Sequence, residues 1–100
     1  MNEKIRVTVD ADLEELIPGF LENRRNDLES LRKAAGEKDL ATLQSIGHSL
    51  KGVGGGYGFA GMSEIGAEIE RQAKAGSITE LPGCIEKLAD YLERIEIVFE

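Results

Sequence analysis

The chain contains one histidine, and the residues around it are of types that could do chemistry on an anionic group. His48 stands in the segment GHSLKGVGGGYG, residues 47–58, and Lys51 follows it by three positions. An exposed imidazole is mostly neutral near pH 7, so one ring nitrogen can act as a nucleophile without a general base. A lysine on the next helical turn could neutralise part of the charge of a bound anion. This pair is therefore the first candidate for a chemical function.

The segment around His48 keeps the apolar spacing of a helix despite its glycines. Apolar residues recur at steps of three and four positions and predict one core-facing side: Leu40, Leu43, Ile46, Leu50, Val53 and Tyr57. At about 100° per residue, His48 lies about 160° from the centre of that side, so we expect it to face solvent with Gly52 and Gly55 nearby. Core-facing Gly47 and Gly54 would instead permit close packing of a neighbouring helix.

The glycines leave two interpretations of residues 52–58 open. Each glycine inside a helix costs roughly 1 kcal/mol relative to alanine, so a helix through all four glycines of residues 52–56 would lose about 4 kcal/mol. Such a loss is tolerated where something must approach the backbone closely. Alternatively, the segment is a flexible loop and His48 is an ordinary surface histidine. The continued spacing of Val53 and Tyr57 favours the helix.

The N-terminal part predicts an arm and two helices. Residues 4–9, KIRVTV, alternate and are rich in β-branched side chains, but no second strand is recognisable, so residues 1–9 are predicted to form an extended arm. Asp10 or Asp12 can cap a short helix. Pro18 then begins a second helix, because proline is tolerated in the first helical turn.

Three further helices complete the predicted fold. Gly36 ends the second helix, and Asp39 can cap the third. A fourth helix ends at Gly76, and Ser77 or Thr79 opens a fifth that continues to the C-terminus. We therefore predict one domain of 100 residues with an all-α fold. Its architecture is an antiparallel four-helix bundle with a short additional N-terminal helix.

Composition limits the classes of partner. The 12 Lys and Arg against 19 Asp and Glu give a net charge of −7, which would repel nucleic acid. The apolar runs are too short for a membrane span or a signal peptide, so we expect a cytoplasmic protein without a membrane partner. The lone Cys84 has no partner for an internal disulfide and is expected to be buried as a small hydrophobe.

The sequence around the histidine resembles a known family. Residues 48–52, HSLKG, follow the pattern H-x-L-K-G, and Gly58 stands ten positions after the histidine. The segment is similar to the histidine-phosphotransfer (HPt) domains of two-component phosphorelays, especially their small stand-alone members. The resemblance covers almost the whole chain. It implies that His48 is the phospho-accepting residue, that Lys51 is its electrostatic companion, and that Gly52 leaves the adjacent turn bare for a docking receiver domain.

The resemblance also singles out Glu70. In the family, a carboxamide or carboxylate twenty-two positions after the histidine often hydrogen-bonds the imidazole, and Glu70 occupies that position here. It would fix the tautomer of His48 and present Nε2 outward. Apart from the family spacing, Glu70 could equally be an ordinary surface charge. Surface residues around the histidine are expected to bind the partner: Gln44, Ser45, Gly52 and Gly55.

These residues predict a histidine phosphotransfer protein. It would accept a phosphoryl group on His48 and exchange it with aspartates of response-regulator receiver domains, downstream of a hybrid sensor histidine kinase. Such a chain is a carrier rather than an enzyme, and no bound cofactor or metal is expected, because the receiver would supply Mg²⁺ and the aspartate. No sustained heptad pattern is present, so a monomer is expected.

Three other functions are compatible with parts of the sequence. A helical adaptor could bind a signalling partner without phosphate, although it would not need Lys51 beside an outward His48. The GxGxxG string of residues 56–61 lacks the preceding strand of a nucleotide-binding fold. A hydrolase using His48 as a base would need a paired nucleophile or carboxylate dyad, and none stands at a recognisable spacing.

Overall fold

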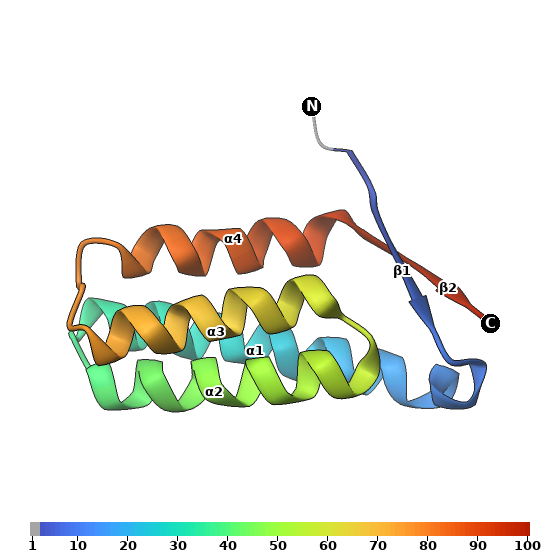
Figure 1. Ribbon diagram of the computed structural model, residues 1–100, viewed down its shortest axis with the longest axis horizontal. Coiled ribbons are helices and arrows are strands. Elements are labelled where there is room, and N and C mark those ends of the chain that lie inside the picture. The colour runs from blue at the N-terminus through green and yellow to red at the C-terminus, as the bar shows by residue number, and fades with distance from the viewer. Residues whose placement is uncertain (1–2) are drawn as a thin grey trace.

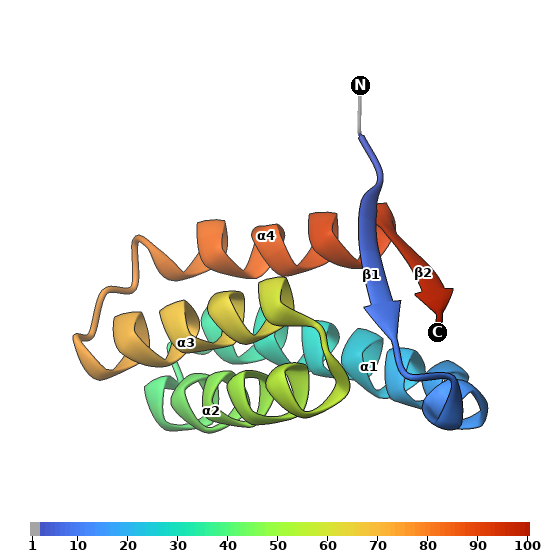
Figure 2. The ribbon, with the colours of Figure 1, turned by 45° about the vertical axis from the view of Figure 1, so that its right-hand side comes forward.

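The computed structural model describes residues 3–100, which form four α-helices with a two-stranded sheet at one end (Figures 1 and 2). The helices are α1 (Ile17–Gly36), α2 (Leu40–Tyr57), α3 (Ala60–Lys74) and α4 (Leu81–Arg94). A 3-10 helix, η1 (Ala11–Leu16), precedes α1, and the strands are β1 (Ile5–Val9) and β2 (Ile95–Phe99). The mostly helical architecture expected from the sequence is confirmed.

The helix ends follow local sequence signals. Pro18 lies in the first turn of α1, where its missing N–H costs nothing. Asp39 caps α2, because its side chain accepts a hydrogen bond from the Thr42 N–H at 3.1 Å. Gly58 ends α2 with a left-handed φ of 89°. Since α2 continues unbroken to this glycine, the loop interpretation of residues 52–58 is wrong.

The core lies between the helices and extends under the sheet. Phe20 of α1 stacks on Tyr57 and Phe59, with ring centroids 4.4 Å and 5.1 Å apart, and this holds the end of α2 against α1. Cys84 is buried, as its apolar neighbours predicted. The largest fully buried side chains come from the four α-helices, the turn between α2 and α3, and β1: Phe59, Leu31, Leu43, Leu50, Met62, Ile69, Leu81, Ile85, Leu88 and Val9. Across residues 3–100, no helix is both long and apolar enough to cross a membrane.

The two ends of the chain differ from the prediction. Residues expected to form an unpaired arm instead form β1, which pairs in parallel with β2, Ile5 opposite Ile95 and Val9 opposite Phe99. Helix α4 therefore ends at Arg94 and does not reach the C-terminus. The sequence could not show this pairing, because the partner segments stand at opposite ends of the chain. Residues 1 and 2 of the expected arm lie outside the described residues.

The start of α4 also corrects the prediction, because neither Ser77 nor Thr79 caps it. Glu80 occupies the N-cap position and makes no capping bond through its side chain. The Ser77 carbonyl accepts hydrogen bonds from the N–H groups of Glu80 and Leu81, at 3.1 Å and 3.3 Å, and so forms a turn before the helix. Pro82, in the first turn, then sets the helical backbone.

Helices α2 and α3 approach each other at backbone distance. A Cβ atom at Gly47 would lie 2.7 Å from the Glu70 nitrogen and 2.9 Å from the Gly66 oxygen. A Cβ atom at Gly66 would lie 2.5 Å from the Lys51 nitrogen. Real side chains do not tolerate such distances, so both positions require glycine.

A second contact continues this approach toward the end of α2. A Cβ atom at Gly54 would lie 2.7 Å from the Ser63 nitrogen. The Ser63 hydroxyl donates a hydrogen bond to the Lys51 carbonyl at 2.7 Å and so joins the two backbones. The role expected for Gly47 and Gly54 in close helix packing is confirmed, whereas the part played by Gly66 was not foreseen.

This contact yields a stability prediction. Gly66→Ala should lower the free energy of unfolding by about 1–3 kcal/mol or more, because the new methyl group must push two backbones apart. Gly56→Ala is the matched control, since no heavy atom lies within 4 Å of a Cβ atom there. It should raise the free energy of unfolding by about 0.5–1 kcal/mol. Urea denaturation measures both, and equal stability of the two variants would contradict the backbone contact.

Candidate functional site

His48 lies in the middle of α2 and faces solvent. Its side chain is 73% exposed, as the helical spacing predicts. The preceding residue, Gly47, is buried against α3, so the backbone beside the histidine is held in place although the ring itself is free. The ring is therefore accessible to another protein.

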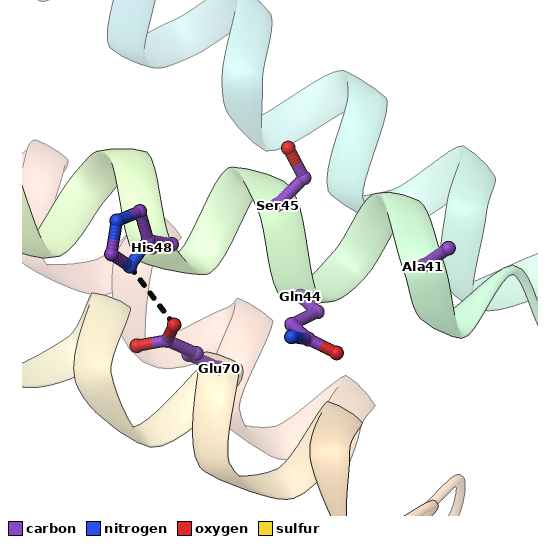
Figure 3. A pocket seen from close by; sticks show the side chains of 5 residues that line it. All are labelled: Ala41, Gln44, Ser45, His48 and Glu70. Carbon is purple, nitrogen blue, oxygen red and sulfur yellow. Dashed lines mark hydrogen bonds and ion pairs between the residues drawn. The ribbon is translucent and has the colours of Figure 1, made fainter.

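The Glu70 side chain reaches the histidine ring from α3 (Figure 3). Its Oε2 atom lies 2.9 Å from Nδ1 of His48, and the Glu70 side chain is only 12% exposed. Figure 3 shows the two side chains pointing toward each other from neighbouring helices. The structure thus brings together two residues that only the family spacing had related.

The charge state of Glu70 determines which ring nitrogen of His48 carries the proton. Desolvation alone would raise the pKa of Glu70, but the hydrogen bond from His48 and the positive charges of Lys74 and Lys51 outweigh it and lower the pKa below its ordinary value. Glu70 is therefore a carboxylate near pH 7 and can only accept in this hydrogen bond. Nδ1 of His48 must then be the donor, which leaves the Nε2 lone pair directed away from Glu70.

Two lysines lie near His48 and Glu70, and only one of them is paired with a carboxylate. Lys74, one helical turn after Glu70, places Nζ 3.7 Å from the same Oε2 atom that His48 contacts. Lys51 is exposed one turn after His48, and no carboxylate of residues 3–100 lies within ion-pair distance of its Nζ atom. Lys51 can therefore meet an incoming anion, whereas the charge of Lys74 is already shared with a carboxylate.

Lys74 was not among the residues predicted for the site. A signal existed, however, because residues at i and i+4 share a helix face. Once Glu70 is known to face His48, Lys74 must lie on the same side of α3.

The residues expected to bind a partner lie on two sides of the histidine. Gln44 and Ser45 line a shallow hollow together with Ala41, His48 and Glu70. Within that hollow, Gln44 points toward α3 and Ser45 points away from it (Figure 3). Gln44 and Ser45 thus offer polar groups to a partner on this side of the site.

The surface on the other side of the histidine is formed by bare backbone. No heavy atom lies within 4 Å of a Cβ atom built at Gly52, and at Gly55 only the Ser63 hydroxyl does, at 3.9 Å. Both glycines are exposed. Nothing within residues 3–100 therefore requires glycine at either position, in contrast to Gly47.

The site offers no metal ligand set of its own. No group of three or more His, Cys, Asp or Glu side chains in residues 3–100 is arranged to hold a metal ion. The chemistry that these residues can perform themselves is nucleophilic attack through Nε2 of His48, supported by the carboxylate on Nδ1.

The hydrogen bond to Glu70 predicts the tautomer of His48. At pH 8, ¹⁵N NMR should show Nδ1 protonated and Nε2 unprotonated, and Glu70→Ala should shift the population toward the Nε2-protonated tautomer. Glu64→Ala, which removes an exposed carboxylate from the same helix, should leave the tautomer unchanged.

The lowered pKa of Glu70 determines how the stability of the folded state changes with pH. Because the native state favours the carboxylate, its stabilising contribution is present above the ordinary carboxyl pKa and is lost as pH falls through the lowered native value.

For the tautomer, an Nε2-protonated ring in the unmodified protein at pH 8 would contradict the assignment of the proton to Nδ1.

Comparison with known proteins agrees with this geometry. A family model described as Hpt domain matches residues 15–97, which include all four helices and the pair of His48 and Glu70. No curated protein and no solved structure matches the chain. Since the family model covers most of the sequence, the chain belongs to the Hpt domain family.

Proposed function

We propose that His48 is the phospho-accepting residue and that the chain exchanges its phosphoryl group with aspartates of response-regulator receiver domains. Hpt domains are phosphocarrier modules of two-component signalling that interact with kinases and response regulators, and they are not catalytic enzymes. The observation that carries the proposal is the exposed imidazole whose Nδ1 lies 2.9 Å from a carboxylate oxygen. An adaptor that only binds a partner has no use for this arrangement.

The transfer step follows from the tautomer. The Nε2 lone pair attacks the phosphorus of the receiver's aspartyl phosphate, an Nε2–P bond forms, and the P–O bond to the aspartate breaks. The aspartate leaves as a carboxylate with the bonding electron pair. Nδ1 keeps its proton, so the ring becomes positively charged, and the carboxylate of Glu70 stabilises that charge through the existing hydrogen bond. The reverse sequence returns the phosphoryl group to an aspartate.

The lysines have separate roles in this proposal. Lys51, without a carboxylate partner among the described residues, neutralises part of the phosphoryl charge as the group arrives on Nε2. Lys74 stays with Glu70 and favours its ionised form. Phosphoryl transfer depends mainly on positioning and electrostatics, so a nearby unpaired cation contributes directly to the rate.

Docking of the receiver would use both sides of the histidine. Gln44 and Ser45 would contact it from the shallow hollow, and the bare surface at Gly52 and Gly55 would let its active site come close to Nε2. The lack of any close contact to a Cβ atom built at either glycine supports this role, because a side chain there would not disturb helix packing.

The remaining requirements would come from partners. A hybrid sensor histidine kinase would stand upstream, and the receiver would bring Mg²⁺ together with its aspartate, because residues 3–100 contain no cluster of metal ligands. We place the chain in the cytoplasm, with its four helices forming an antiparallel bundle. Transfer itself requires only one copy of the chain.

Removal of the imidazole tests the acceptor site. His48→Gln should abolish acid-labile phosphorylation by a receiver charged with acetyl phosphate, because His48 is the one imidazole of the sequence. Circular dichroism should show unchanged helical content, since the ring is 73% exposed and fills no core space. Persistent acid-labile labelling of this variant would exclude His48, and no labelling of the unmodified chain by several receivers would favour the adaptor.

Removal of the nearby cation tests Lys51. Lys51→Ala should slow transfer in rapid-quench measurements without preventing it, because the nucleophile remains intact. Lys33→Ala is the matched control, since it removes the same charge from the last turn of α1. If both variants transfer at the unmodified rate, Lys51 has no part in charge stabilisation; if both are slowed equally, only the overall charge of the chain matters.

A further inference from the structure

Strand β2 has an unusual composition for the edge of a sheet. Its sequence is IEIVF, and four of its five side chains are apolar and only partly buried. Strand β1, by contrast, alternates between exposed residues and the buried Val7 and Val9. Natural edge strands usually carry charged side chains that discourage further pairing, whereas β2 carries a single charged residue, Glu96. β2 therefore has the composition of an interior strand at an edge position.

The outer edge of β2 carries unpaired backbone groups. The Glu100 N–H donates to the Val9 carbonyl at 3.0 Å, and the Glu100 carbonyl accepts from the Ala11 N–H at 2.9 Å. Because backbone groups alternate in direction along a strand, those of Ile97 and Phe99 must point away from β1. No other hydrogen bond to these groups occurs within residues 3–100. Among the described residues, the sheet consists of β1 and β2, and a two-stranded sheet is marginal without further support.

An apolar groove runs beside this free edge. Ile17, Pro18 and Leu21 of α1 line it together with Ile97 and Phe99 of β2. Three charged side chains complete the lining: Glu14, Glu22 and Arg25. A strand added to β2 would cover the groove with every second side chain, because alternate residues of a strand face the same side.

We propose that the occupant of this edge is β2 of a second copy of the chain, paired antiparallel across a two-fold axis at Ile97. Two sheets would then join into one of four strands in the order β1-β2-β2-β1. The interface would be isologous, because each copy would present the same edge and the same groove. This inference does not depend on the proposed phosphotransfer function.

The charges of β2 select this register. Centred on Ile97, an antiparallel pair places Ile95 opposite Phe99 and Ile97 opposite its own copy. Glu96 then faces Val98 and already has Arg6 as its neighbour in β1. Centring on Glu96 would oppose two carboxylates directly, and centring on Val98 would place Glu96 opposite Glu100. Only the register at Ile97 keeps three apolar pairs without opposing like charges.

The ends of the paired strands are also complementary. In the same register, Arg94, which precedes β2 in one copy, and Glu100, which follows β2 in the other, come to the same end of the paired strands. Arg94 already donates to the carboxylate of Asp90 and to the Glu3 carbonyl, but guanidinium has five N–H groups, so further donors remain. The backbone hydrogen-bonding groups also fit this register, because the N–H and C=O of Ile97 in each copy would pair with those of Ile97 in the other.

The position of the edge leaves the phosphotransfer site free. In Figures 1 and 2, β2 continues from α4 and runs past the end of the bundle that holds η1 and the start of α1. His48 lies on α2, and none of the groove residues comes from that helix. The family model ends at residue 97 and begins after β1, so the sheet is largely an addition to the Hpt core.

Analytical ultracentrifugation tests the association. The unmodified chain should show a concentration-dependent dimer between micromolar and millimolar concentration at moderate salt, which screens the repulsion between two chains of charge −7. Ile97→Lys should abolish the dimer, because it places two lysines face to face. Val98→Lys is the matched control and should retain the dimer, since the new lysine would face Glu96 of the other copy.

Disulfide formation tests the register and does not depend on the stability of the lysine variants. Ile97→Cys should form a disulfide-linked dimer on mild oxidation, since hydrogen-bonded pairs have Cα atoms about 5.5 Å apart, within disulfide range. Val98→Cys should form far less, and the buried Cys84 should form none.

Two outcomes would rule out the dimer through β2. A monomeric unmodified chain at every concentration, or equal crosslinking at both cysteine positions, would overturn it. Receiver-dependent phosphorylation of Ile97→Lys should remain at the unmodified rate, so loss of the dimer and loss of phosphotransfer are separate outcomes. A dimer that survives Ile97→Lys would show that the chain associates through another surface.

Discussion

The close approach of α2 and α3 at Gly47 and Gly66 is the constraint on which the rest of the structure depends. At this point, backbone meets backbone, and a Cβ atom at Gly47 would lie 2.7 Å from the Glu70 nitrogen. Glu70 therefore starts close to the residue that precedes His48, and its side chain can reach Nδ1 at 2.9 Å. Any side chain at Gly47 would separate the helices and lengthen that hydrogen bond. The same close approach thus determines both the packing of α2 on α3 and the orientation of the imidazole.

The glycines of α2 lie on two different faces of the helix. Gly47 and Gly54 face α3, where added atoms would meet its backbone at 2.7 Å. Gly52 and Gly56 face open space, so no packing contact explains them. An interior glycine costs roughly 1 kcal/mol relative to alanine, and the fold offsets this cost only for the first group. The exposed group therefore supports a surface that another protein approaches, as the phosphotransfer proposal requires.

The charges near His48 differ from the net charge of the chain. The net charge is −7, but Lys51 and Lys74 both lie near the carboxylate of Glu70, which contacts His48. Lys74 and the imidazole share one oxygen of Glu70, which keeps the carboxylate ionised and directs the Nε2 lone pair outward. These charges would favour an anionic group at His48 despite the negative net charge, because nearby charges outweigh distant ones in salt.

The sequence by itself determined most of the helices, the cap of α2 at Asp39 and the outward direction of His48, because these follow from neighbours within a few positions. It related Glu70 to the histidine only through the spacing typical of the family. Tertiary structure alone decided that Gly66 meets Gly47, that Lys74 joins Glu70, and that the chain ends pair as β1 and β2. These contacts join segments far apart in the chain, and local periodicity carries no information about which distant segment a residue will meet. The apolar steps of residues 95–99 fit a strand as well as a helix, so only the presence of β1 could settle their conformation.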